Sequence, residues 1–393
     1  MKSKYKTLLI LLILFFLPYV SAQTVSISGS VLLDNINERV PLVQVDLIDA
    51  NSFTILDSVF ADDFGNYHFQ NVDTQGGTLD IFLNVISDSS FADIAYNLFQ
   101  ASYNHQSSVY SNINSNTAIN ISINTNNNTE EAFKVHNHLY KVFVYYRDIL
   151  EFTPSGEVNV FFPTTSSTGY SNIGNLIHLE QGDTEYKKVV HEYGHLIIDK
   201  LYVTDPANEA DCERVQTNPF TETGCKELAF EEGYADYHIS PPNNTDMGPS
   251  TYTQGLENTV FNLAHNTAMG HKFHGEISGI FWDIADAPNS SDGSVGVDDD
   301  KIFNKDHMLW NVLYEYSQSE KPTDILEFYD RWINKKDYVE YKNLQNELYD
   351  IYYENNIISG TNDERISNDW AFFLEISLNS YSLNVYNKVV EYL

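Results

Sequence analysis

Two histidines four positions apart carry the clearest chemical signal in the sequence. His191 and His195 bound the run HEYGH, in which Glu192 follows the first histidine. The run contains no proline, and Asp183 or Thr184 can cap a helix ahead of it. On a helix, residues four apart lie on one face, so both imidazoles can reach one metal ion while Glu192 lies beside a metal-bound water. The pattern predicts a zinc site, and the alternative is an ordinary helix that contains two histidines.

A catalytic zinc ion needs a third protein ligand, with its fourth position left open for water. The helical stretch at residues 227–237 supplies the candidates. Glu232 and Asp236 are four apart and share a face, so Glu232 can bind the metal while Asp236 accepts a hydrogen bond from a ligating histidine. The neighbouring Glu231 lies four residues before Ala235, which offers no polar support, so Glu232 is the preferred ligand.

Both segments resemble motifs of the gluzincin metallopeptidases, which include thermolysin-like and fungalysin-like groups. The resemblance rests on HEYGH at residues 191–195 and on EGYADY at residues 232–237. It implies a zinc ion held by His191, His195 and Glu232, with Glu192 as the general base in peptide-bond hydrolysis. Zinc lowers the pKa of its bound water towards about 7, and Glu192 would pass the abstracted proton to the leaving amine.

A second electrophile besides zinc can stabilise the tetrahedral oxyanion of such a reaction. His274 is the preferred donor, because it precedes a block at residues 275–283 that loosely resembles the fungalysin-like region after the third ligand. A solvated or buried histidine without a catalytic role is an equal alternative. Tyr234 and Tyr237 are the other candidates.

The start of the sequence predicts a cleaved secretory signal peptide over residues 1–22. Lys2, Lys4 and Lys6 form a positive start, an unbroken apolar run follows, and small residues end at Ala22. The apolar run is far shorter than the about 20 residues that a membrane span needs. We therefore expect an exported protein, secreted or periplasmic or at the cell surface, with no membrane span after cleavage.

The composition is acidic and rich in aromatic residues. The 393 residues include 22 Lys+Arg against 55 Asp+Glu, a net charge of −33, and 42% of them are apolar. This charge disfavours nucleic acid and anionic lipid as partners, because both require Lys and Arg to meet phosphates. The composition is that of an acidic, soluble globular protein and leaves the oligomeric state open. A protein or peptide substrate is what the gluzincin resemblance implies.

A group of aspartates downstream of the zinc motifs raises the question of a calcium site. Clustered carboxylates occur in calcium sites, but the spacing here does not match an EF-hand. An acidic surface loop is therefore the preferred interpretation, and Ca²⁺ is the less favoured second cofactor. The residues are Asp286, Asp292, Asp298, Asp299 and Asp300.

The pattern predicts a multidomain chain: an all-β sandwich, then a part with both helices and strands that is mostly α-helical towards its C-terminus. The gluzincin resemblance implies that this second part is an α+β zincin-like metallopeptidase domain with a mostly α-helical C-terminal lobe. Period-two alternation places the sandwich at residues 23–118. Residues 119–129 have the composition of a linker, although isoleucines within it could form a last strand. The metallopeptidase domain then occupies residues 130–393.

The predicted sandwich resembles carboxypeptidase-regulatory-like and prealbumin-like modules. The resemblance rests on residues 27–31, 41–42 and 65–69. No group of catalytic residue types lies in this range, so a structural or binding appendage is the expected role.

The whole sequence favours an exported zinc metallopeptidase. One alternative is a non-catalytic peptidase-fold binding protein at the cell surface, and another is a structural protein whose metal holds only the fold. The presence of Glu192 argues against a binding protein, which has no use for a base. An open zinc position argues against the structural alternative, because structural sites usually have four protein ligands.

Cys212 and Cys225 lie in a polar stretch between the second histidine and the third ligand. In an oxidising compartment we predict one disulfide between them, worth about 3 kcal/mol in the chain-entropy model. Two free thiols, or thiols that bind a metal, are the alternatives.

Mass spectrometry of an unreduced digest should show the two linked peptides. Complete alkylation of both thiols in protein purified from an oxidising compartment would contradict the bridge.

Overall fold

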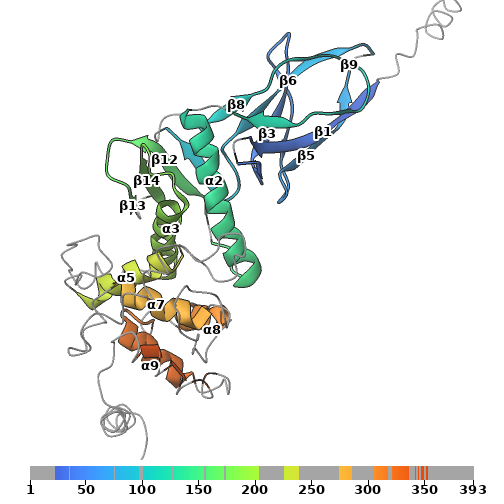
Figure 1. The fold of residues 1–393 in the computed structure, drawn as a ribbon. Helices are drawn as coiled ribbons and strands as arrows, with labels where there is room; N and C mark the ends of the chain where they lie inside the picture. The colour runs from blue at the N-terminus through green and yellow to red at the C-terminus, as the bar shows by residue number, and fades with distance from the viewer. Residues whose placement is uncertain are drawn as a thin grey trace, which may run out of the picture. The chain divides into compact units, whose positions relative to one another are not determined.

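The computed structural model describes most of the chain between residues 23 and 352 (Figure 1). The described ranges are 23–34, 36–74, 76–96, 101–124, 127–154, 156–171, 174–202, 225–238, 274–285, 305–316 and 321–335, with 341, 344, 347–348 and 351–352. The predicted signal peptide therefore lies outside the described residues. Among the described residues, no helix is both long and apolar enough to cross a bilayer.

The chain divides into two compact units, which are described separately below. The first comprises Met1–Tyr140, Gly156–Gly169 and Ile173–Thr184, and the second comprises Lys141–Ser155, Tyr170–Asn172 and Glu185–Leu393. The helix α2 (Asn128–Val144) and the short strand β13 (Gly169–Ser171) each contribute residues to both units.

The first unit contains a five-stranded sheet organised around its longest strand, β1 (Thr24–Leu33). β1 pairs antiparallel with β5 along nearly its whole length and antiparallel with β2, and it pairs parallel with β10 and β11. The partners are β2 (Glu38–Arg39), β5 (Asn66–Asp73), β10 (Thr117–Ala118) and β11 (Ile121–Ile123).

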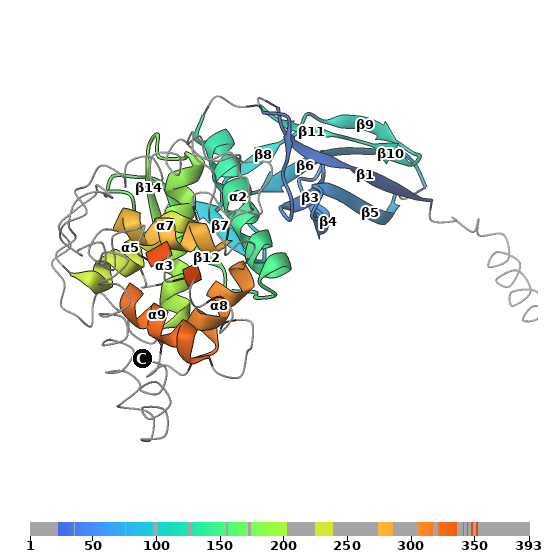
Figure 2. The same ribbon diagram turned by 60° about the horizontal axis from the view of Figure 1, so that its bottom comes forward.

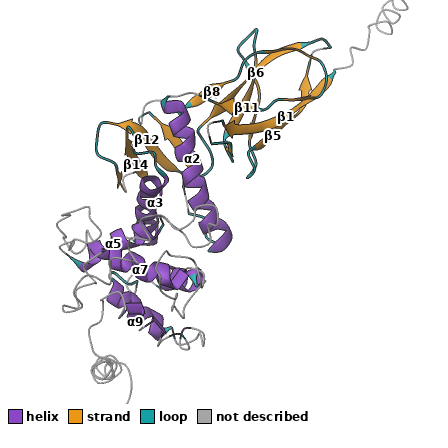
Figure 3. Cartoon of the chain, in the orientation of Figure 1, coloured by secondary structure: helices purple, strands orange, loops and turns teal. Residues whose placement is uncertain are grey.

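A second five-stranded sheet in the same unit is antiparallel throughout. In it β3 pairs with β4 on one side and β6 on the other, and β6 also pairs with β8 and β9. The strands are β3 (Gln44–Asp49), β4 (Ile55–Phe60), β6 (Leu79–Ile86), β8 (Asn104–Gln106) and β9 (Tyr110–Ile113). Figure 3 draws both sheets in orange.

The two sheets share one hydrophobic core. Buried residues largely alternate along β1 and β5, as the period of two requires, and Ile27 and Val31 of β1 and Val45 of β3 are fully buried. These residues belong to a single buried cluster, which also includes Phe69 of β5 and Phe133 of α2. The burial of both inner faces matches what a small β-sandwich requires.

The stretch predicted as a linker, residues 119–129, begins inside this core. Ile121 and Ile123 lie in β11, which pairs with β1, and Ile119 is also buried. The Tyr67 hydroxyl donates a 2.5 Å hydrogen bond to the Ile119 carbonyl. Alternating isoleucines outweigh the polar composition here, because one face of this segment can bury against β1. Residues 119–123 therefore lie in the first unit, and Ile121 and Ile123 form the last strand that the sequence left open.

A third sheet also crosses the predicted boundary. Strand β12 (Val158–Thr164) pairs parallel with β14 (Leu176–Glu180) on one side and with β7 (Ala92–Ala95) on the other. β7 falls within the range assigned to the sandwich, whereas β12 and β14 fall within the expected peptidase domain. Sequence alternation cannot reveal this pairing, because it shows that a strand is half-buried and not which strand lies next to it.

The second unit is mostly helical in its described residues, which also include Tyr170 and Ser171 of β13. It contains η1, a π-helical turn (Tyr145–Ile149), and five α-helices that contact one another in chain order (Figure 2). The α-helices are α3 (Tyr186–Leu201), α5 (Lys226–Tyr237), α7 (His274–Ala285), α8 (Asp306–Tyr314) and α9 (Ile325–Asn334). The architecture is thus multidomain with both α and β structure.

Candidate metal centre

Helix α3 carries the two histidines and is buried along most of its length. It begins one or two residues later than predicted, with Glu185 as its N-cap residue. The two predicted caps bond elsewhere in the first unit: the Thr184 hydroxyl donates to Glu131, and Asp183 accepts a 2.6 Å hydrogen bond from Thr168. Their side chains are therefore engaged away from the first amides of α3.

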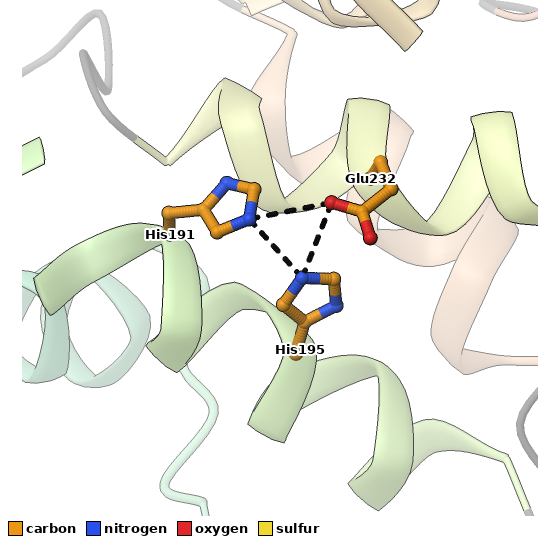
Figure 4. Close-up of side chains that lie close together, drawn as sticks. All are labelled: His191, His195 and Glu232. Atoms are coloured by element: carbon orange, nitrogen blue, oxygen red, sulfur yellow. Dashed lines mark hydrogen bonds and ion pairs between the residues drawn. The ribbon is translucent and has the colours of Figure 1, made fainter. Parts of the chain in front are cut away.

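The structure brings together His191, His195 and Glu232, from α3 and α5 (Figure 4). The Nε2 atoms of the two histidines are 3.2 Å apart. The Glu232 Oε2 atom lies 3.3 Å from the His191 Nε2 and 3.5 Å from the His195 Nε2. Three potential ligand atoms thus form a nearly equilateral triangle, and among the described residues this is the one group arranged to hold a metal ion.

Each histidine is oriented by a further carboxylate on its other nitrogen. The His191 Nδ1 lies 2.8 Å from the Asp236 Oδ1, and the His195 Nδ1 lies 3.1 Å from the Glu231 Oε1. A carboxylate only accepts, so each Nδ1 carries a proton, and each Nε2 faces the centre of the triangle, where it can bind a metal ion once it gives up its own proton. This is how ligating histidines are usually held.

Glu231 contacts the candidate site in a way that the sequence did not predict. The sequence favours Glu232 over Glu231 as a ligand because Glu231 has no polar neighbour four residues along α5. In the structure its partner is on the other helix, at His195. Spacing within α5 cannot show a contact that forms between two helices, although two adjacent glutamates on a buried helix are themselves unusual.

The electrostatics of the site favour a positive charge. Burial alone would lower the pKa of His191, but hydrogen bonds to Asp236 and Glu232 hold this pKa well above its ordinary value. Against the same burial, Glu232 and Glu231 raise the pKa of His195 to about 10. The two imidazoles hold the pKa of Glu232 well below its ordinary value, although burial alone would raise it. The acidic groups that favour a proton here also favour a metal cation.

The triangle fits a tetrahedral zinc ion. Two imidazole nitrogens and a carboxylate oxygen face one point, where a bound cation would replace the protons of the imidazoles. Tetrahedral zinc with bonds of about 2.0–2.1 Å holds its ligand atoms roughly 3.3 Å apart. The separations in the structure, 3.2, 3.3 and 3.5 Å, surround that value. Two imidazole nitrogens and one carboxylate oxygen are also a ligand set typical of catalytic zinc.

Gly194 allows α3 and α5 to approach closely enough to form the triangle. A Cβ atom at this position would lie 2.6 Å from the Ala235 Cα and 3.0 Å from the His238 Nδ1. Gly194 lies between the two histidines in sequence, and Ala235 lies between Glu232 and Asp236. The two helices thus approach closely at residues that lie between the proposed ligands in sequence.

The remaining predicted residues have different outcomes. Glu192 lies in α3 with 9% of its surface exposed. His274 is the first residue of α7, but its side chain lies outside the described residues. Cys225 is the N-cap residue of α5, whereas Cys212 lies outside the described residues, so their bridge stays a prediction. The aspartates of the calcium hypothesis, residues 286–300, also lie outside them.

Comparison with known proteins adds a family match. Residues 155–346 match the model of the mycolysin C-terminal domain. This range is just under half of the chain and includes both HEYGH and EGYADY. The match supports a gluzincin peptidase and a protein or peptide substrate.

Other comparisons add little. No curated protein matches. A solved structure of a 9R-lipoxygenase from Cyanothece PCC8801 aligns with 10% identity over 59% of this chain and 26% of that chain, at a TM-score of 0.19. A similarity this low carries no argument about fold or function.

We predict that Gly194→Ala weakens metal binding at this site. The added methyl group would force α3 and α5 apart, and overpacking of this kind costs about 1–3 kcal/mol. Affinity for added Zn²⁺, measured by chelator competition, should fall roughly 10–100-fold, as when groups that orient metal ligands are lost. Gly169→Ala is the control, because a Cβ there has no atom within 4 Å. Equal zinc affinity in the two variants would contradict the role assigned to the close approach.

Proposed function

We propose that this protein is an exported zinc-dependent metallopeptidase that hydrolyses peptide bonds. The observation that carries the proposal is the triangle of His191, His195 and Glu232, in which carboxylates hold both imidazoles with their Nε2 atoms directed at one point. The match to the mycolysin C-terminal domain supports the same activity.

The three proposed ligands leave one coordination position of a tetrahedral zinc ion open for water or substrate. When bound, zinc supplies Lewis-acid chemistry: it lowers the pKa of a water molecule towards about 7 and polarises a carbonyl group. His191, His195 and Glu232 provide three ligand atoms, and among the described residues no fourth His, Cys, Asp or Glu joins this group. Three protein ligands are the number found in catalytic zinc sites, where a fourth position stays available.

Glu192 is the proposed general base. It follows His191 on α3 and is nearly buried, so its carboxylate acts in a site from which bulk water is largely removed. Glu192 takes a proton from the attacking water and returns it to the leaving amine. His274 remains the proposed oxyanion donor. Tyr234 and Tyr237 are poor candidates, because both hydroxyls are buried in hydrogen bonds to other side chains.

The four carboxylates of the proposed site have different roles. Asp236 and Glu231 bind the outer nitrogens of the histidines, which fixes the tautomers and increases the basicity of the ligating nitrogens. Glu232 stays ionised between two imidazoles, as a ligand must. Glu192 has neither task and is left for proton transfer. A binding protein with no catalytic role would not require that fourth carboxylate.

The proposed location is outside the cytoplasm, because the sequence begins with the pattern of a signal peptide. The β-sandwich predicted over residues 23–118 is then an appendage of the enzyme, as the resemblance to carboxypeptidase-regulatory-like modules suggests. The proposed bridge between Cys212 and Cys225 would restrain the start of α5, where Cys225 is the N-cap residue.

We expect Glu192→Gln to abolish most of the activity while zinc stays bound. The substitution preserves size but removes the base, and general-base catalysis contributes roughly 10²–10⁴-fold. The measurement is cleavage of casein or a peptide library, with and without chelator, together with zinc content by atomic absorption. Glu185→Gln, at the exposed start of α3, is the control that should retain full activity. Substantial chelator-sensitive cleavage by Glu192→Gln would remove Glu192 from the mechanism.

Alanine substitutions of the two adjacent glutamates should separate the ligand from its support. Glu232→Ala removes a proposed ligand, so the zinc stoichiometry of the purified protein should fall close to zero. Glu231→Ala removes only the partner of His195, which should weaken zinc affinity by about 10–100-fold and leave a measurable site. Zinc titration of both variants checks the order. A Glu231→Ala variant that loses more zinc than Glu232→Ala would reverse the assignment.

A further inference from the structure

Two consecutive buried tyrosines contact the helix that carries the proposed carboxylate ligand. Tyr145 and Tyr146 open the π-helical turn η1, and both are buried. The Tyr146 hydroxyl lies 2.9 Å from that of Tyr234, and the Tyr145 hydroxyl lies 2.8 Å from that of Tyr237. Both partners lie on α5.

The Tyr146 contacts form a closed ring of hydrogen bonds. The His238 Nδ1 donates to the Tyr234 carbonyl at 2.7 Å, because a carbonyl can only accept. Burial lowers the pKa of His238 to about 3, so its ring is neutral and its Nε2 accepts. The Tyr146 hydroxyl donates to this Nε2 and must then accept from the Tyr234 hydroxyl. Every hydroxyl proton in the ring has a defined direction.

The Tyr145 contacts end at a buried carboxylate. The Asp306 Oδ1 accepts a 2.6 Å hydrogen bond from Tyr145 and a 3.0 Å hydrogen bond from Tyr237. Asp306 is the first residue of α8 and is only 4% exposed. The side chains of Tyr145, Tyr237 and Asp306 therefore connect η1, α5 and α8 by hydrogen bonds.

Helix α5 needs such contacts because its own sequence does not fix its rotation. A surface helix is oriented by an apolar stripe that faces the core. In α5, buried residues surround the axis and include Glu231 and Asp236 as well as the aromatic residues. The apolar pattern of α5 therefore does not by itself select one rotation, whereas hydrogen bonds between fixed partners are directional.

The tyrosines and the ligands lie on different sides of α5. Tyr234 and Tyr237 are three residues apart and share one face, while Glu232 and Asp236 are four apart and share another. Glu232 and Tyr234 are two apart and so point away from each other. Side-chain atoms lie about 5–6 Å from a helix axis, so a rotation of roughly 10° moves them by about 1 Å. A metal site tolerates only about 0.5 Å.

We infer that the hydroxyl groups of Tyr145 and Tyr146 are positioning groups for the metal centre. They fix the rotation of α5 about its axis and thereby place Glu232 in the ligand triangle, with Glu231 and Asp236 beside the histidines. The inference rests on the proposed zinc function of that triangle. Neither tyrosine touches the metal ligands directly in this arrangement: each acts through Tyr234, Tyr237 or His238.

The test is the double variant Tyr145→Phe/Tyr146→Phe, with each single variant beside it. The matched control is Tyr352→Phe, because Tyr352 is also fully buried and donates a 2.8 Å hydrogen bond, but to the Ile325 carbonyl of α9. Each protein is titrated with Zn²⁺ against a chromophoric chelator and with Co²⁺ to record the d–d absorption bands. Thermal unfolding of the metal-free proteins measures the loss of stability.

The double variant should bind Zn²⁺ roughly tenfold or more weakly, the lower end of what loss of orienting groups costs. Its Co²⁺ bands should shift or weaken, because the ligand geometry changes. Tyr352→Phe should lower the unfolding temperature without changing either metal readout. Should the double variant fail to fold, the single variants test the same expectation.

Wild-type affinity and spectrum in the tyrosine variants would overturn the inference. An equal loss of affinity in Tyr352→Phe would also overturn it, because the effect would then follow stability alone. A wild-type protein that binds neither Zn²⁺ nor Co²⁺ would refute the proposed function itself, and the inference with it. Metal binding by the wild type thus separates the two failures.

Discussion

The close approach of α3 and α5 is the contact on which the candidate centre depends. Two histidines on α3 form only half of a site, and the carboxylates that complete it are on the other helix. The helices meet with Gly194 against the Cα of Ala235, where no side chain fits between them. Because this contact involves residues that lie between the proposed ligands in sequence, a small change in helix separation would alter the distances from Glu232 to both histidines.

Charge balance is the second constraint on the site. Two imidazoles and several carboxylates lie in a buried region, where an unpaired charge is costly. The Nδ1 atom of each imidazole contacts a carboxylate, Asp236 for His191 and Glu231 for His195. Both Nε2 atoms face the centre of the triangle, beside the carboxylate of Glu232. A dication at the centre would complete the pairing. The same balance explains the raised pKa values of the histidines in the metal-free state.

Buried tyrosines, rather than only aliphatic side chains, form the core between η1, α5 and α8 in the second unit. Tyr145, Tyr146, Tyr234 and Tyr237 combine large rings with hydroxyl groups that all find partners. Their rings fill the core between η1, α5 and α8, while their hydrogen bonds select one arrangement of these elements. The first unit uses the opposite solution, in which alternating aliphatic residues of two sheets meet in a core with few polar groups.

Local elements could be predicted from the sequence alone. They are the helix with His191 and His195, the second helix with Glu232 and Asp236, and strands such as β1 and β3. These follow from periods of 3.6 and 2, which neighbouring residues carry. Three contacts are visible only in the tertiary structure: Asp236 with His191, Glu231 with His195, and strand β7 with β12. The tertiary structure also placed Ile121 of the expected linker in the core. The physical reason is that these contacts join residues far apart in the chain, and their register depends on packing between whole elements, which no local period records.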